Sequence, residues 1–108
     1  MIYVDIYRQH SQIKQFTVTG HAKSGPYGYD LVCAGVSAVT FGSVNAIMEL
    51  GEMDLPIEQG GEGGFLRVTV PQKVTVDAMK KAQTLLEGMV ISLKTIEKEY
   101  GENIYIHD

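Results

Sequence analysis

The sequence predicts a single small domain of the α/β (α+β) class, in which two helices pack with a mostly antiparallel sheet. Three observations predict it. The chain has 108 residues, the size of one domain with one sizeable core. Several short stretches alternate apolar and polar residues, as half-buried strands do, and two longer stretches are typical of helices. We therefore expect one domain over residues 1–108, with the order β-β-α-β-α-β.

The strands are expected where the alternation is clearest. Residues 2–7 and 15–19 alternate, and the polar stretch 8–12 between them indicates a turn, so these two strands form a hairpin. A third strand is expected at residues 65–70 and a last one at 104–106. The acidic connection 52–64, which ends in a glycine-rich run, leaves room for a short edge strand near Ile57.

The first helix is expected from about Leu31 to Leu50, and Gly51 follows it as a natural stop. Residues 31–48 carry no formal charge, and a run of that length raises the question of a membrane span. Polar residues such as Ser37 interrupt the run, and no basic flank follows it. We therefore expect no membrane and a helix that is buried on nearly all sides.

The second helix is expected to begin at Thr75 or Asp77 and to end at Gly101. Its apolar residues recur every three or four positions, which predicts one buried face. This long helix should pack with the sheet beside the first one.

Charge and cysteine content limit the class of protein. The net charge is −4, and no run of basic residues is longer than Lys80-Lys81, which disfavours direct nucleic-acid binding. A single cysteine excludes an intrachain disulfide and a multi-cysteine zinc site. A lone thiol fits a reducing, cytoplasmic setting, and the N-terminus gives no sign of a signal peptide.

Cys33 falls in the first turn of the first expected helix. The positive end of the helix dipole and the unpaired N–H groups there stabilise a thiolate. The alternative is that a lone cysteine in an apolar run is only a small buried hydrophobic residue. The position of Cys33 alone leaves both interpretations open.

His21 favours the first interpretation. It lies just past the second expected strand, on a loop that returns to the helix with Cys33, so the two side chains can meet. A Cys–His pair is the minimal unit of thiol nucleophilic catalysis, because the imidazole accepts the thiol proton. The alternative is a loop histidine that is solvated or bonded locally.

Two further polar residues have a structural and a catalytic interpretation. Asp30 either caps the helix or orients and charge-stabilises His21. Ser37 is four residues after Cys33, on the same helix face, where it either bonds within the site or donates back to the Cys33 carbonyl.

The loop between His21 and the helix is rich in glycine and proline. Gly25, Pro26, Tyr27 and Gly28 suit a flap that closes over a bound peptide, although an ordinary surface loop has the same composition. The histidines at positions 10, 21 and 107 lie on distant elements, so we expect no metal site.

The stretch Gly20-His21-Ala22-x-x-Gly25, followed by Asp30-Leu31-Val32-Cys33-Ala34-x-Val36-Ser37, resembles the signature of the ribosomal-processing cysteine protease family (Prp). The similarity extends over the whole chain. It implies that Cys33 is the nucleophile and His21 its base, that Asp30 and Ser37 support them, and that the glycine-containing loop gates the substrate.

The resemblance also implies a substrate and an assembly. Family members remove an N-terminal extension from ribosomal protein 27 of the large subunit, form homodimers and need no cofactor or metal. The extension would bind as an extended peptide, along a strand edge. Two rival hypotheses remain from the residues alone: a non-catalytic ribosome-assembly or peptide-binding module, and a thiol redox sensor that would need a resolving thiol from elsewhere.

Overall fold

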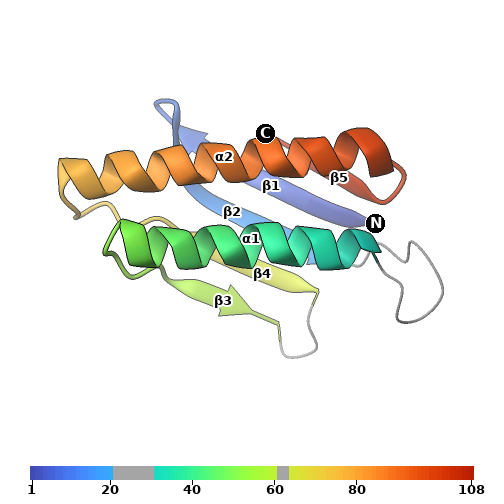
Figure 1. The fold of residues 1–108 in the computed structure, drawn as a ribbon, viewed down its shortest axis with the longest axis horizontal. Coiled ribbons are helices and arrows are strands. Elements are labelled where there is room, and N and C mark those ends of the chain that lie inside the picture. Colours follow the sequence, from blue (N-terminus) through green and yellow to red (C-terminus); the bar gives the residue numbers. More distant parts are fainter. Residues whose placement is uncertain (21–30, 61–63) are drawn as a thin grey trace.

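Seven helices and strands follow one another in the computed structural model, which describes residues 1–20, 31–60 and 64–108. They are β1 (Ile2–Gln9), β2 (Gln12–Gly20), α1 (Leu31–Leu50), β3 (Ile57–Gln59), β4 (Phe65–Thr69), α2 (Val76–Tyr100) and β5 (Ile104–His107). The predicted fold class is confirmed, and the optional edge strand near Ile57 is present as β3. Figure 1 shows the arrangement.

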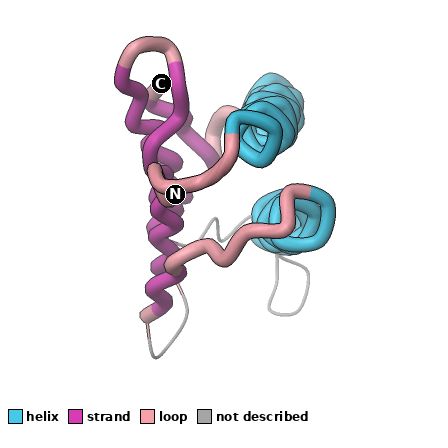
Figure 2. The backbone as a smooth tube through the Cα atoms, turned by 90° about the vertical axis from the view of Figure 1, so that its left-hand side faces the viewer, coloured by secondary structure: helices cyan, strands magenta, loops and turns pink. Residues whose placement is uncertain are grey.

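The five strands form one sheet in the order β3-β4-β2-β1-β5. β1 and β5 are parallel, and the other neighbouring pairs are antiparallel, so the sheet is mostly antiparallel as expected. Both helices lie side by side on one face of the sheet, and no described element covers the other face (Figure 2). This one-sided cover explains why the alternation in the sequence is so clear.

The β1–β2 hairpin closes more tightly than the sequence predicted. Its strands extend to Gln9 and resume at Gln12, so the turn is only His10 and Ser11, both with positive φ (52° and 68°). Positive φ at both central residues matches the right-handed twist of the flanking strands. The polar residues on either side therefore belong to strands, and alternation failed to show this because a register shift lies at Tyr7/Arg8.

The core lies between the sheet and the two helices. In β1 the side chains of Ile2, Val4 and Ile6 are buried, while Tyr3 and Tyr7 are exposed on the opposite face. The same core takes Val32 and Val36 of α1 and Leu86, Met89 and Leu93 of α2, among others.

α1 is apolar and contributes to this core, but the expectation that it is buried on nearly all sides is wrong. Its buried residues form one stripe: Val32, Val36, Thr40, Val44 and Ile47. The Thr40 hydroxyl, inside this stripe, donates to the Val36 carbonyl (2.8 Å). By length and composition alone α1 could cross a membrane, although core helices of soluble proteins meet the same test.

The opposite face of α1 is exposed and made of small or uncharged residues. Ala34, Ala38, Phe41, Gly42 and Asn45 all lie on it. Gly42 is not in close contact with another part of the described chain, since a Cβ there would have no atom within 4 Å.

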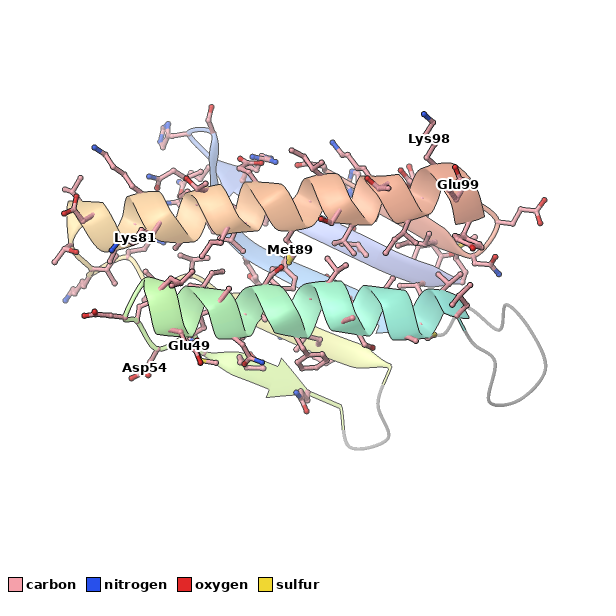
Figure 3. All side chains as sticks on the ribbon, in the orientation of Figure 1. Glu49, Asp54, Lys81, Met89, Lys98 and Glu99 are labelled. Carbon is pink, nitrogen blue, oxygen red and sulfur yellow. The ribbon has the colours of Figure 1, made fainter. Side chains whose placement is uncertain are left out.

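α2 begins and ends as predicted. Thr75 is its N-cap, and its hydroxyl accepts the Ala78 N–H (3.1 Å). Gly101 is the C-cap. α1 has one charged side chain, Glu49 near its end, whereas α2 presents charged side chains to solvent along its length, among them Lys81, Lys98 and Glu99 (Figure 3).

His107 is part of β5. Its Nδ1 lies 3.3 Å from the Asp5 carboxylate, across the parallel β1–β5 pair. Pairing with β1 orders the end of the chain, and a short final strand gives little sign of this in sequence.

Candidate functional site

Cys33 lies in the first turn of α1, as predicted, and its side chain is half-buried. It lines a cavity of about 340 Å³ between the N-terminal half of α1 and the sheet. Cys33 also packs against the hydrophobic core, so its interpretations as a nucleophile and as a small apolar core residue both stay open.

One wall of the cavity is a line of side chains along α1. Cys33, Ser37 and Phe41 follow one another at intervals of four residues, which places them on one face of the helix. Ser37 and Phe41 are exposed, so this wall is open to solvent along its outer side. Phe41 was not anticipated as a site residue, although its spacing of eight from Cys33 carries the same signal as Ser37.

The other wall comes from the β3–β4 end of the sheet. Gln59 and Gly60 lie at the end of β3, and Gly64 and Phe65 lie at the start of β4. The floor is apolar and consists of Ile2, Val18, Val36 and Leu66. Sequence analysis missed this wall, because only the pairing of β4 with β2 brings it opposite α1.

Ser37 is an exposed residue of α1 that lines the cavity, and hydroxyl residues further along the helix bond back to the helix backbone. Thr40 and Ser43 donate to the carbonyls of Val36 and Val39, each four residues earlier (2.8 and 2.6 Å). The two interpretations of Ser37, a bond within the site and a bond back to the Cys33 carbonyl, both stay open.

Gly20 closes the cavity at the end of β2, and the local backbone requires a glycine. Its φ is +89°, and a Cβ at this position would overlap the Met1 carbonyl oxygen. Gly20 immediately precedes His21 in the sequence, so the chain leaves the described part of the sheet at the cavity that holds Cys33.

The described lining of the cavity has no charged side chain. His21, Asp30 and the loop residues Gly25, Pro26, Tyr27 and Gly28 lie outside the described residues. Their roles as base, cap or orienting group, and gate therefore stay predictions.

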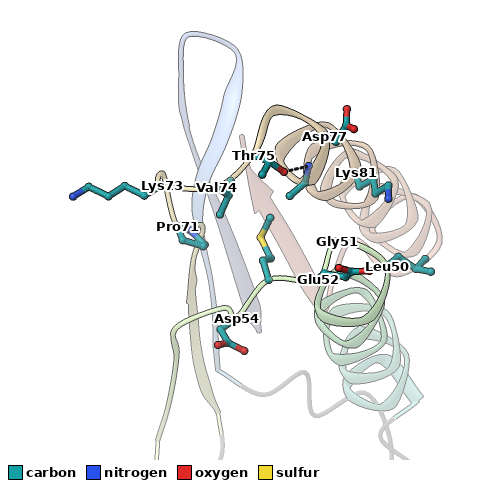
Figure 4. A pocket seen from close by; sticks show the side chains of 12 residues that line it. Leu50, Gly51, Glu52, Asp54, Pro71, Lys73, Val74, Thr75, Asp77 and Lys81 are labelled. Carbon is teal, nitrogen blue, oxygen red and sulfur yellow. Dashed lines mark hydrogen bonds between the residues drawn. The ribbon is translucent and has the colours of Figure 1, made fainter.

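A larger cavity of about 580 Å³ lies at the opposite end of the helices, where α1 ends and α2 begins (Figure 4). It is lined by Leu50, Asp54, Lys73 and Lys81, among others. Acidic and basic side chains are mixed there, so no single ligand charge is favoured. It contains neither Cys33 nor Ser37.

The chain is similar to known proteins over nearly its whole length. The family model described as "Cysteine protease Prp" matches residues 1–105. The chain is 43% identical over 107 residues to the "Ribosomal processing cysteine protease Prp" of Bacillus subtilis (strain 168), covering 98% of this chain and 96% of that protein. It is 42% identical over 109 residues to the protein of the same name in Staphylococcus aureus (strain NCTC 8325 / PS 47), covering 99% and 98%.

Solved structures show the same fold. The S. aureus protease Prp with a covalently linked product peptide superimposes with a TM-score of 0.87 at 41% identity, covering 99% of this chain and 98% of that chain. The same protease with a substrate peptide gives a TM-score of 0.81 at 40% identity, again covering 99% and 98%. The match to the family model and the identity over the whole length show that the chain belongs to the Prp family of cysteine proteases.

Proposed function

We propose that the protein removes the N-terminal extension of ribosomal protein 27 of the large subunit, with Cys33 as nucleophile and His21 as general base. The observation that carries the proposal is the cavity at the start of α1, which is lined by the half-buried Cys33. The names of the B. subtilis and S. aureus relatives, both ribosomal-processing proteases, support the substrate class.

The reaction begins when the Cys33 thiol gives its proton to the His21 imidazole. The sulfur attacks the carbonyl carbon of the scissile peptide bond, and a tetrahedral oxyanion forms. The N–H groups of the first turn of α1, which have no partner inside the helix, are suited to stabilise this oxyanion. The carbon–nitrogen bond then breaks, and the leaving amine takes the proton from the imidazolium.

A water molecule completes the cycle. His21 takes one proton from the water, whose oxygen attacks the thioester carbonyl. The carbon–sulfur bond breaks, the extension leaves as a carboxylic acid, and the proton returns to Cys33. These proposed reaction steps use no metal and no cofactor.

The remaining residues assist this pair in the proposal. In the proposal the imidazolium of His21 stabilises the Cys33 thiolate, because an opposite charge nearby favours the charged form. Asp30 caps α1 or orients His21, and the Ser37 hydroxyl bonds the substrate in the cavity. The loop with Gly25, Pro26, Tyr27 and Gly28 admits and covers the peptide.

The proposal extends to the setting of the enzyme. The single cysteine of the chain must stay reduced to act as a nucleophile, which fits the cytoplasm. We also propose a homodimer, and the uncharged exposed face of α1 is the surface best suited to a second copy.

The test is incubation of the purified protein with the ribosomal protein 27 precursor of its own organism under reducing conditions, followed by mass measurement. We expect loss of a defined N-terminal segment with the wild type and none with Cys33→Ser or His21→Ala. His10→Ala is the matched control, because His10 lies in the β1–β2 turn. If the extension survives the wild-type enzyme, the assigned substrate is wrong.

A further inference from the structure

The two edge strands of the sheet, β5 and β3, differ in whether another described part of the chain bonds their outward backbone groups. At one edge, the backbone N–H of Ile106 in β5 donates to the Glu97 carboxylate of α2 (2.7 Å). A side chain thus occupies an edge group that would otherwise pair with another strand, a common way to protect an edge. The other edge is β3, whose three residues are all exposed.

The hydrogen bonds of β3 show which of its backbone groups face outward. Gly60 donates to the Phe65 carbonyl (3.1 Å), and Thr69 donates to the Pro56 carbonyl (3.1 Å). Bonded and non-bonded pairs alternate in an antiparallel ladder, so positions 56, 58 and 60 bond to β4. The N–H and C=O groups of Ile57 and Gln59 therefore point away from the sheet, and no described residue bonds them.

This edge is continuous with the cavity that holds Cys33. Gln59 and Gly60 form part of the cavity wall. Ile57 pairs with Val68 and Gln59 with Leu66, so their side chains lie on the face of the sheet that the helices cover. α1 does not reach far enough to bury them, and Ile57 is 37% exposed. The helix-side face of β3, at Ile57 and Gln59, is therefore partly exposed and continuous with the cavity.

We propose that a segment of the substrate adds to β3 as a further strand, paired with the outward backbone groups of Ile57 and Gln59. The neighbouring residues of the peptide then enter the cavity beside Cys33. The occupant is an extended peptide. β3 offers outward backbone groups at only two residues, which suits a short peptide segment, and the strand ends at the cavity with Cys33. This inference rests on the proposed function and specifies how its substrate is held.

Strand addition has a consequence for specificity. Main-chain hydrogen bonds supply affinity that does not depend on the peptide sequence, and alternate side chains of the peptide supply the selection. The side chains facing the helices would meet Ile57 and Phe41, which favours apolar residues at every second position.

Proline substitution on β3 tests the outward groups separately from the fold. Gln59→Pro removes only an outward N–H, which an edge strand tolerates. Glu58→Pro removes an N–H that faces β4, so it should lower the unfolding temperature where Gln59→Pro does not. Gln59→Ala is the matched control, since it removes the same side chain and keeps the N–H.

The measurement is the binding of a fluorescent peptide, spanning the extension and cleavage point of the ribosomal protein 27 precursor, to the Cys33→Ala protein. We expect the Kd of Gln59→Pro to be about tenfold higher than that of Gln59→Ala, which corresponds to the loss of one hydrogen bond. In the active protein, which keeps Cys33, the Gln59→Pro substitution should raise KM more than it lowers kcat. N-methylation of the peptide should weaken binding at every second position.

The outcomes separate the two proposals. Binding without cleavage by the wild type contradicts the proposed reaction and leaves strand addition in place. Equal Kd values for Gln59→Pro and Gln59→Ala overturn strand addition, whether or not the peptide is cleaved. The same holds if the Cys33→Ala protein does not bind the peptide, or if N-methylation shows no alternation.

Discussion

Arg8 and Glu87 are joined by two hydrogen bonds, from Nη1 to Oε2 (2.6 Å) and from Nη2 to Oε1 (2.8 Å). The same guanidinium donates through Nε to Asp108 (2.6 Å). One side chain of β1 thus connects the middle of α2 with the last residue of the chain. Hydrogen bonds from Arg8 hold the pKa of both carboxyls below their ordinary values.

This pairing predicts how stability depends on pH. Since both carboxyl pKa values are lower in the folded state, the unfolded chain binds more protons at acid pH. The stabilisation is complete above the unfolded values of about 4 and is lost as the pH falls through the lower folded values. Urea unfolding between pH 7 and pH 2 should show this loss.

Glu87→Gln measures the contribution of one partner. The Glu87 side chain is 43% exposed, so we expect a loss of about 0.5–1 kcal/mol in the free energy of unfolding at pH 7. The difference from wild type should shrink in acid, where both carboxyls are protonated. Glu99→Gln, on the exposed side of α2, is the control and should change little. A difference that stays constant with pH would contradict the pairing.

A pair of glycines predicts opposite effects of the same substitution. Gly20→Ala places a Cβ on the Met1 carbonyl oxygen at a φ of +89°, so we expect a loss of about 1–3 kcal/mol in unfolding free energy. Gly88→Ala fills open space in the middle of α2 and should gain about 1 kcal/mol. Thermal unfolding of the two variants checks both signs, and similar stability of the two would contradict the positions assigned to these glycines.

The contact between Gln83 and the backbone of Ile13 predicts a further effect on stability. Its side chain accepts the Ile13 N–H (2.8 Å) and donates to the Ile13 carbonyl (2.9 Å), which connects α2 to β2. Because Ile13 is buried, Gln83→Ala leaves two backbone groups without partners, and we expect a loss of about 1–3 kcal/mol in unfolding free energy. Thr84→Ala, the exposed neighbour, should cost far less. Faster hydrogen exchange at the Ile13 amide in Gln83→Ala would identify the cause.

The sequence predicted the fold wherever burial is one-sided. Alternation in residues 2–7 follows from a sheet that the helices cover on one face only. The same signal could not indicate which face of α1 is buried, because valine, alanine, glycine and serine occur around its whole circumference. β3 has only three residues, all exposed, so it produces almost no pattern.

The site could be predicted along α1 but not across the sheet. Cys33 and Ser37 were expected on one face because helix geometry is local, and both line the cavity. Gln59 and Phe65 form the opposite wall through the pairing of β3 and β4, which no local pattern encodes. The role of His21 stays a prediction.

The two helices differ on their outward faces, and this difference bears on the proposed homodimer. Both lie on the same side of the sheet (Figure 2). α2 presents charged residues such as Lys98 and Glu99, as a solvated helix does. α1 exposes Ala38, Phe41 and Gly42, with no formal charge between residues 31 and 48. Uncharged, apolar exposed surface of this kind is typical of a contact with another molecule.

Gly42→Glu tests whether a second copy covers this face. A side chain at position 42 meets nothing within the described chain, so the variant should fold normally by circular dichroism. In a C2 interface each substitution acts twice, because the same patch serves both subunits. We therefore expect light scattering to give a dimer for the wild type and a monomer for Gly42→Glu, while Ser92→Glu on the outward face of α2 stays dimeric. If the wild type is monomeric, or if Gly42→Glu stays dimeric, the exposed face of α1 is not the dimer interface.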